Sequence, residues 1–179
     1  MSVRLVLLGL LRDRPLYGYE IKRLIEQYMS DWTSIAFGSI YFALDKLAEE
    51  QLVEKIAVEH EGKRPARSVY QITDLGHEEF LHLLREAWRT FDRQYYDLDI
   101  CLFFLPALPR PEVLVYLRER RDMLARAVDY IQSHRREQLN DPHIPPLAAA
   151  IFDHGQVHAQ AELSWTTGLL QKLEAGEYN

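Results

Sequence analysis

The sequence predicts a mainly α-helical protein with one small β-hairpin, divided into an N-terminal domain over residues 1–90 and a helical domain over residues 91–179. Apolar residues recur at three- and four-residue steps along most of the chain, as on the buried face of a helix. Two β-rich runs, residues 52–58 and 68–73, interrupt that period. The chain of 179 residues is 47% hydrophobic and 27% charged, which supports two small packed cores and argues against disorder.

The first two helices are predicted at residues 2–12 and from residue 16 to about residue 29. Pro15 ends the first helix, because proline disfavours helical backbone in the residue before it. The second helix has one apolar stripe that should face the core. This stripe consists of Tyr17, Ile21, Leu24, Ile25 and Tyr28.

A third helix should begin at Ser39, whose hydroxyl is suited to accept hydrogen bonds from the first free backbone N–H groups. Ile40, Leu44 and Leu47 recur at helical spacing and are expected to face inward. That orientation leaves four residues at or near the outer side of the helix, and an exposed aromatic ring among them calls for a function. The four residues are Ser39, Tyr41, Phe42 and Lys46.

The β-rich runs and the turn between them predict a hairpin with a basic tip. The turn reads Glu-Gly-Lys-Arg-Pro and cannot be buried, and Lys63, Arg64 and Arg67 lie in it or just beyond it. Thr73 is then placed to cap a fourth helix, and a helix N-terminus that carries a hydroxyl can bind a phosphate. A solvated charged turn is the commoner meaning of such a tip when it stands alone.

A third helix followed by a hairpin with a basic tip is the outline of a winged helix-turn-helix, which points to DNA binding. The helix would enter the major groove, and the tip would contact the phosphate backbone. The net charge of −6 opposes this interpretation, since residues 1–88 carry 11 Lys and Arg against 14 Asp and Glu. Phosphate contacts require local rather than global positive charge, so we expect modest non-specific affinity and dependence on dimerisation.

The second half predicts a helical dimerisation domain, with helices at about residues 98–105, 111–139 and 147–174 separated by proline-rich breaks. In the middle helix, apolar residues at coiled-coil-like spacing are interrupted by arginines, which favours a packed bundle over a free coiled coil. Winged-helix dimers must hold two recognition helices about one DNA turn apart, so we expect the long helices to form the dimer. The residues assigned to this contact are Leu117, Leu124, Val128, Ile131 and Trp165.

Aromatic residues gather in the sequence where the two predicted domains meet. They suit a pocket for an aromatic effector, and Arg89 or Arg93 would pair with a carboxylate if the ligand carried one. An aromatic core between the domains explains the same residues without a ligand. The predicted pocket residues are Trp88, Phe91, Arg93, Tyr95, Tyr96 and Phe103.

His154, His158 and Glu162 stand four residues apart on one face of the last helix, a spacing that can hold a zinc ion. A satisfied polar pair at a helix packing seam is the simpler interpretation. The single cysteine, Cys101, lies in an apolar run and is interpreted as a core residue. We recognise no phosphate-binding loop or catalytic constellation, and we expect no cofactor, no metal and no enzymatic activity.

Four short motifs stand in a fixed order over residues 1 to about 88. They are Tyr17-Gly18-Tyr19-Glu20-Ile21, Gly38-Ser39-Ile40-Tyr41, Leu44-x-x-Leu47 and Tyr70-Gln71-Ile72-Thr73-x-x-Gly76. Their order and spacing resemble the PadR family of transcriptional regulators, and the second half is similar to the longer subgroup with a C-terminal domain related to bacterial virulence activators. The resemblance implies a homodimeric, usually repressing DNA-binding protein, often released by a small molecule, and gives Tyr41 a phosphate-contacting role.

The expected partners are double-stranded DNA with an inverted-repeat operator, a second copy of the chain and a small-molecule effector, which the resemblance suggests is a phenolic acid in founding members of the family. Short apolar runs, the lack of an export signal and the single cysteine favour a cytoplasmic protein that does not enter a membrane. The alternatives are a metal-responsive regulator, a transcriptional activator and a winged helix that serves only to bind another protein.

Overall fold

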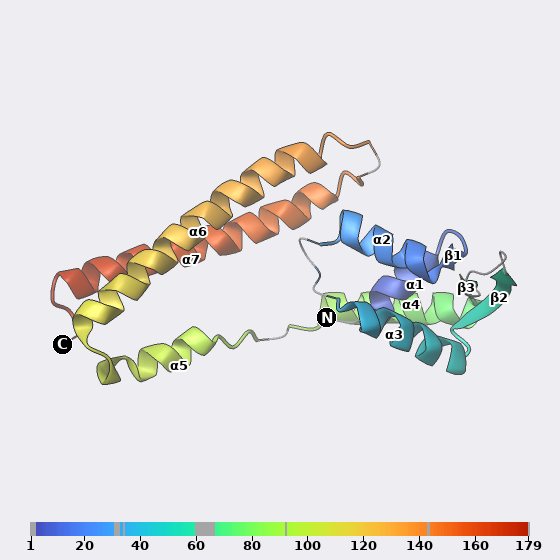
Figure 1. The fold of residues 1–179 in the computed structure, drawn as a ribbon, viewed down its shortest axis with the longest axis horizontal. Helices are drawn as coiled ribbons and strands as arrows, with labels where there is room; N and C mark the ends of the chain where they lie inside the picture. The colour runs from blue at the N-terminus through green and yellow to red at the C-terminus, as the bar shows by residue number, and fades with distance from the viewer. Residues whose placement is uncertain are drawn as a thin grey trace. The chain divides into compact units, whose positions relative to one another are not determined.

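The chain forms two compact units, residues 1–93 and 94–179, and each has a core of its own (Figure 1). The computed structural model describes residues 3–30, 33, 35–59, 67–91, 93–142 and 144–178. The predicted fold class is confirmed, because helices dominate both units and the strands form one small antiparallel sheet. Among the described residues, no helix is both long and apolar enough to cross a membrane.

The first unit is a winged helix-turn-helix with a three-stranded sheet in the order β1-β3-β2. Strand β3 lies in the middle and pairs antiparallel with both neighbours. The register between β2 and β3 shifts between Lys55 and Ala57, where the ladder is irregular. The elements are α1 (Val3–Leu11), β1 (Leu16–Tyr17), α2 (Gly18–Tyr28), α3 (Phe37–Glu49), β2 (Val53–Glu59), β3 (Arg67–Ile72) and α4 (Asp74–Arg89).

Strand β1 is a feature that the sequence analysis assigned to the start of a helix. Its two residues pair with β3, Leu16 opposite Tyr70 and Tyr17 opposite Val69. A two-residue strand cannot display the alternation of apolar and polar residues that identifies strands in a sequence. The strand forms because its two residues pair with the edge of β3, a contact between segments that are distant in the sequence.

The core of the first unit gathers apolar residues from every one of its elements. The predicted inward face of α3 is confirmed, since Ile40, Leu44 and Leu47 are at most 2% exposed. They pack with Leu7, Leu8 and Leu11 of α1 and with residues of α2, β2 and β3. This burial fixes the rotation of α3 about its axis and therefore decides which side chains face outward.

Helix α3 begins earlier than predicted. Ala36 is the N-cap residue, and Ser39 lies inside the first turn, where its hydroxyl donates a hydrogen bond to the Ala36 carbonyl. The expectation that Ser39 caps the helix is therefore wrong. A serine in the first turn can satisfy its hydroxyl on a carbonyl of the preceding turn, and that local bond competes with the capping geometry.

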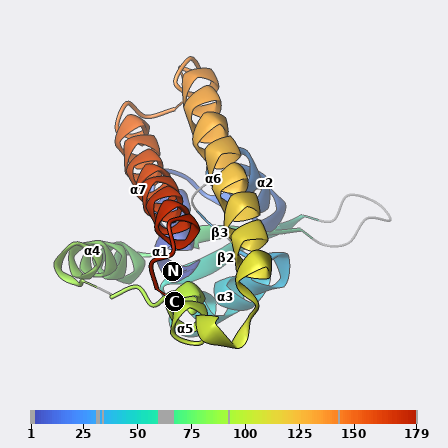
Figure 2. The ribbon, with the colours of Figure 1, turned by 90° about the vertical axis from the view of Figure 1, so that its left-hand side faces the viewer.

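The second unit consists of α5 (Asp97–Phe103), the short 3₁₀ helix η1 (Leu105–Ala107), α6 (Arg110–Gln138) and α7 (Ala148–Glu174). Helices α6 and α7 run side by side in opposite directions, as Figures 1 and 2 show. At one end of this pair Val113 and Leu117 pack against Leu170 and Leu173. The pair is a long helical hairpin whose outer faces are open in a single chain.

Cys101 is exposed, which corrects its interpretation as a core residue. It lies on α5, a helix of seven residues none of which is buried. An apolar run normally indicates burial, but α5 meets no large surface within its own unit that would cover it.

Candidate nucleic-acid interface

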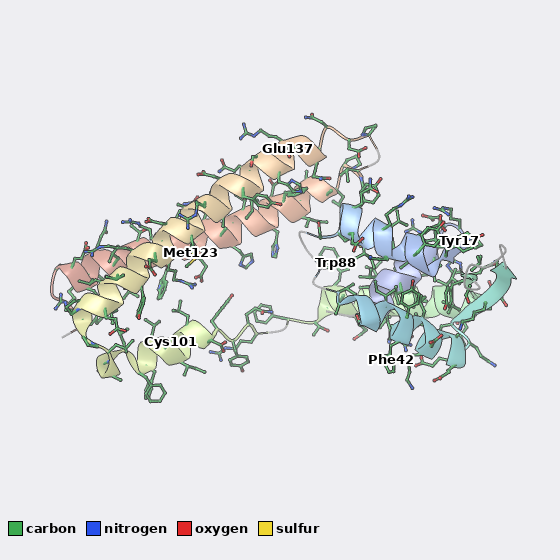
Figure 3. All side chains as sticks on the ribbon, viewed as in Figure 1. Tyr17, Phe42, Trp88, Cys101, Met123 and Glu137 are labelled. Carbon is green, nitrogen blue, oxygen red and sulfur yellow. The ribbon has the colours of Figure 1, made fainter. Side chains whose placement is uncertain are left out.

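The outer side of α3 presents two aromatic side chains at its N-terminal half. Phe42 is 67% exposed and Tyr41 is 40% exposed. Figure 3 shows Phe42 projecting from the outer side of the helix. Exposed apolar patches can mark interaction sites, so this face is the candidate interface.

Tyr41 packs closely against the first residue of α2. A Cβ atom at Gly18 would lie 2.7 Å from Cε1 of Tyr41, so only glycine leaves room for the ring. On either side of Gly18, the rings of Tyr17 and Tyr19 stack with their centroids 5.6 Å apart. Gly18, between these two tyrosines, therefore leaves the space that the Tyr41 ring occupies.

Lys55 links α3 to the sheet. Its Nζ donates a hydrogen bond of 3.0 Å to Oδ1 of Asp45 on α3 and lies 5.5 Å from the centre of the Tyr70 ring on β3. The hydrogen bond to Asp45 raises the pKa of Lys55 above its ordinary value, so the side chain stays charged. This pair connects the helix and the hairpin at the point where they join.

Lys46, a predicted DNA-contacting residue, forms an ion pair of 3.4 Å with Glu49 on the next turn of α3. Both side chains are more than half exposed, so the pair is weak and can open for a phosphate. At the C-terminal end of the helix, Glu50 is bound by Arg4 of α1. The described cations of α1, α3 and β2 that adjoin the helix are thus paired with carboxylates.

The basic tip lies largely outside the described residues. Lys63 and Arg64 belong to the part of the chain that the structure does not describe. Arg67 opens β3 and is paired in register with Glu59, while its side chain lies outside the described residues. Their assignment as DNA-contacting residues stays a prediction.

Thr73 is the N-cap of α4, as predicted. Its hydroxyl accepts a hydrogen bond of 3.0 Å from the backbone N–H of Gly76 and donates one of 2.8 Å to the carbonyl of Gln51. The hydroxyl has a single proton to donate, and Gln51 takes it. A phosphate contact by Thr73 would replace that bond, so its role in DNA binding stays a prediction.

The aromatic residues of the predicted effector pocket are exposed within their own units. Trp88 and Phe91 of the first unit are 84% and 91% exposed. In the second unit Tyr95 and Phe103 are 82% and 79% exposed, and Tyr96 is half exposed. Phe103 makes an edge-to-face contact with Phe104, at 5.1 Å between ring centroids. Arg93 is exposed as well, and the pocket stays a prediction.

The predicted dimerisation residues differ in burial within the single chain, and their role in the dimer stays a prediction. Leu117 and Val128 are buried, and Leu117 packs against α7. Leu124 and Ile131 are half-buried, and Trp165 is 42% exposed. A second set of apolar residues, which the sequence pattern did not single out, is exposed on the helical pair. These are Val115, Tyr116, Met123, Tyr130, Leu147 and Val157, of which Figure 3 labels Met123.

His154 and His158 lie on an exposed part of α7, which corrects their assignment to a helix packing seam. Their Nε2 atoms are 3.1 Å apart. Glu162, the third residue of the predicted set, forms an ion pair of 2.9 Å with Arg120 on α6. No group of three or more metal-binding side chains assembles within the ranges that the structure describes.

Comparison with known proteins relates the first unit to a family of regulators. Residues 7–82 match the model of the transcriptional regulator PadR-like family. No curated protein matches the chain.

Three solved structures share the fold over almost the whole chain. Bacillus subtilis PadR in complex with operator DNA has 19% sequence identity and a TM-score of 0.77, over 96% of this chain and 98% of that one. The same protein in complex with p-coumaric acid has 18% identity and a TM-score of 0.76, over 96% and 95%. The Vibrio cholerae virulence activator AphA has 18% identity and a TM-score of 0.72, over 97% and 99%.

Proposed function

We propose that this chain is a regulator of transcription and not an enzyme, because residues 7–82 match the model of the transcriptional regulator PadR-like family. As a homodimer it binds an inverted-repeat operator in double-stranded DNA and represses transcription in the cytoplasm. Residues 1–90 bind the DNA and residues 91–179 hold the dimer. The observation that carries the proposal is the outer side of α3. The inner side of this helix is buried in the core, and its outer side exposes Tyr41 and Phe42.

The two sides of α3 support this assignment together. Ile40, Leu44 and Leu47 leave the helix no freedom to rotate, so the outward side chains hold a constant direction. A recognition helix needs such rigidity, because a base contact is lost when the side chain shifts by about one ångström. Phe42 is apolar and suits the methyl group of thymine, whereas Lys46 suits a guanine or a phosphate.

The charge distribution supports a division of labour between helix and hairpin. Since the described cations beside α3 are paired with carboxylates, phosphate affinity should come mainly from Lys63, Arg64 and Arg67. Each of these ion pairs must break before its cation can bind a phosphate, and this cost offsets part of the free energy gained from the phosphate contact. Non-specific affinity is therefore low, and two half-sites bound at once are needed for stable binding.

The proposal is tested by fluorescence anisotropy with DNA from the intergenic region upstream of the protein's own gene, at two salt concentrations. Selective binding that weakens as salt rises supports it, because each phosphate contact releases counterions. Scrambled DNA of the same length is the control. Equal binding to both duplexes, or no binding to either, contradicts the proposal and favours a winged helix that binds another protein.

Substitutions in the hairpin and in α3 should have different effects on DNA binding. Lys63→Ala and Arg64→Ala should weaken binding to all sequences and lower the salt slope by about one unit for each lost contact. Phe42→Ala and Lys46→Ala should reduce the preference for the operator over scrambled DNA. The measurement is anisotropy at several salt concentrations.

Arg118→Ala is the matched control for the hairpin, because it removes a surface cation on α6 that pairs with Glu174 at 2.6 Å. This variant should keep the wild-type salt slope. Equal behaviour of the hairpin and α3 variants would contradict the separation into phosphate-binding and base-reading residues.

A phenolic acid is the effector class that we propose, since a solved structure of the same fold contains p-coumaric acid. The aromatic residues from Trp88 to Phe103 would stack on the ring, and Arg93 would pair with the carboxylate. Addition of p-coumaric acid should release the operator, and Arg93→Ala should weaken that response. The corresponding alcohol, which lacks the carboxylate, should act poorly on the wild type. An equal response to acid and alcohol would exclude a role for the charge pair.

Activation is the alternative direction of regulation, because the virulence activator AphA shares the fold. The protein would then bind its operator in the same way, and only the position of the operator relative to the promoter would differ. A reporter gene fused to the upstream region distinguishes the two. Higher expression after deletion of the regulator gene supports repression, whereas lower expression contradicts it.

A further inference from the structure

We propose that His154 and His158 form a binding site for a divalent transition-metal ion of the zinc, nickel or copper class on the exposed side of α7. Both side chains project from the same side of one helix, four residues apart, and their Nε2 atoms are 3.1 Å apart. Both residues are exposed in the single chain, so an ion can reach them from solvent. This site belongs to the second unit and does not depend on the proposed DNA binding.

The distance between the two nitrogens fits one ion bound by both. Zinc–imidazole bonds are about 2.0–2.1 Å long, and an ion at that distance from two atoms 3.1 Å apart joins them at an angle of about 98°. That angle lies between the octahedral and tetrahedral values. The rings are inclined by 66° with centroids 4.5 Å apart, so they meet edge to face and do not stack. Without an ion, two neutral imidazoles can share only one hydrogen bond at this distance.

The neighbouring carboxylates are engaged elsewhere. Glu162, one turn after His158, pairs with Arg120 at 2.9 Å, and Asp153, beside His154, pairs with Arg135 at 3.0 Å. The ion is therefore held by two imidazoles, and water fills its other positions. Imidazole ligands favour zinc, nickel and copper, whereas magnesium and calcium require oxygen ligands.

Isothermal titration of the full-length protein with Zn²⁺ tests the site without any DNA. The wild type should bind one ion per chain, and Mg²⁺ should give no heat of binding. His154→Ala and His158→Ala should each weaken zinc binding at least tenfold, because even groups behind a ligand commonly contribute about 10–100-fold. Both side chains are exposed, so the variants should keep the thermal unfolding curve of the metal-free wild type.

Two controls make the assignment specific. His82→Ala removes an exposed histidine from α4, and Glu162→Gln removes the carboxylate one turn away. Both variants should bind zinc with an affinity within about threefold of the wild type, below the tenfold effect of losing a ligand. The proposal is overturned if the wild type does not bind zinc, if the His154 and His158 variants bind it as the wild type does, or if either control loses binding.

Discussion

Replacing Gly76 with alanine should strongly destabilise the winged helix-turn-helix unit. A Cβ atom at this position would lie 2.0 Å from the carbonyl oxygen of Leu52 and 2.7 Å from Cγ1 of Ile72. The first of these atoms belongs to the backbone and cannot move aside as a side chain does. It also accepts the hydrogen bond of 3.1 Å from the N–H of Thr73, which closes the hairpin onto α4.

The expected cost is a large part of the stability of the unit. Overpacking of a core costs about 1–3 kcal/mol when side chains can adjust, and more when they cannot. We therefore expect Gly76→Ala to lower the free energy of unfolding by at least about 3 kcal/mol, against the total of about 5–15 kcal/mol that is usual for a domain. Urea titration followed by circular dichroism measures the change.

Gly38→Ala is the matched control, because a Cβ atom at Gly38 of α3 meets nothing within 4 Å. Alanine is a better helix former than glycine by about 0.5–1 kcal/mol, so this variant should be as stable as the wild type or slightly more stable. If Gly76→Ala were as stable as the wild type, α4 would have to be able to move away from Leu52. The two strands and α4 would then be less firmly joined than the contacts indicate.

The sequence analysis foresaw the elements whose signal is local. The periodic apolar residues of α3 identified its inward face, and the motif ending in Gly76 was recognised as a resemblance. The physical reason for Gly76 was not accessible in this way. It depends on Leu52, which lies 24 positions earlier in the sequence and meets the glycine only after the hairpin has closed.

The errors have the same origin. Cys101 stands in an apolar run and was assigned to the core, yet it is exposed on α5, a helix with no buried residue. His154 and His158 were assigned to a packing seam from their helical spacing alone, but spacing does not reveal which side of a helix meets its neighbour. Periodicity shows that residues share a face, whereas burial depends on what lies opposite.

The sequence predicted which residues of the candidate interface face outward. It did not predict the contact that positions one of them. Phe42 is exposed as expected because the opposite face of α3 is apolar. The contact between Gly18 and Tyr41 joins residues 23 positions apart, and no local pattern relates them. The only local signal was a glycine between two tyrosines at the start of a helix. It was interpreted as part of a family motif, which does not explain why a glycine is needed there.

Gly18→Ala should weaken operator binding at least tenfold while costing little stability. The added methyl group would meet Cε1 of Tyr41 at 2.7 Å, and that ring can swing outward because Tyr41 is 40% exposed. The folded unit survives the movement, in contrast with the backbone clash at Gly76. If Tyr41 donates a hydrogen bond to a phosphate, the displaced ring loses an interaction worth about 1.5–3 kcal/mol, which corresponds to about ten- to a hundredfold in affinity.

A double-mutant cycle shows whether Gly18 acts through Tyr41. In the background of Tyr41→Ala, which already lacks the ring, Gly18→Ala should have almost no further effect on the anisotropy titration, so the two substitutions should be strongly non-additive. Tyr41→Phe distinguishes the role of the ring from that of the hydroxyl, because it keeps the ring beside Gly18 and removes only the hydroxyl. Weak binding by Tyr41→Phe assigns the contact to the hydroxyl. Additive effects of Gly18→Ala and Tyr41→Ala would mean that the start of α2 meets the DNA independently, and Tyr41 would then be a packing residue only.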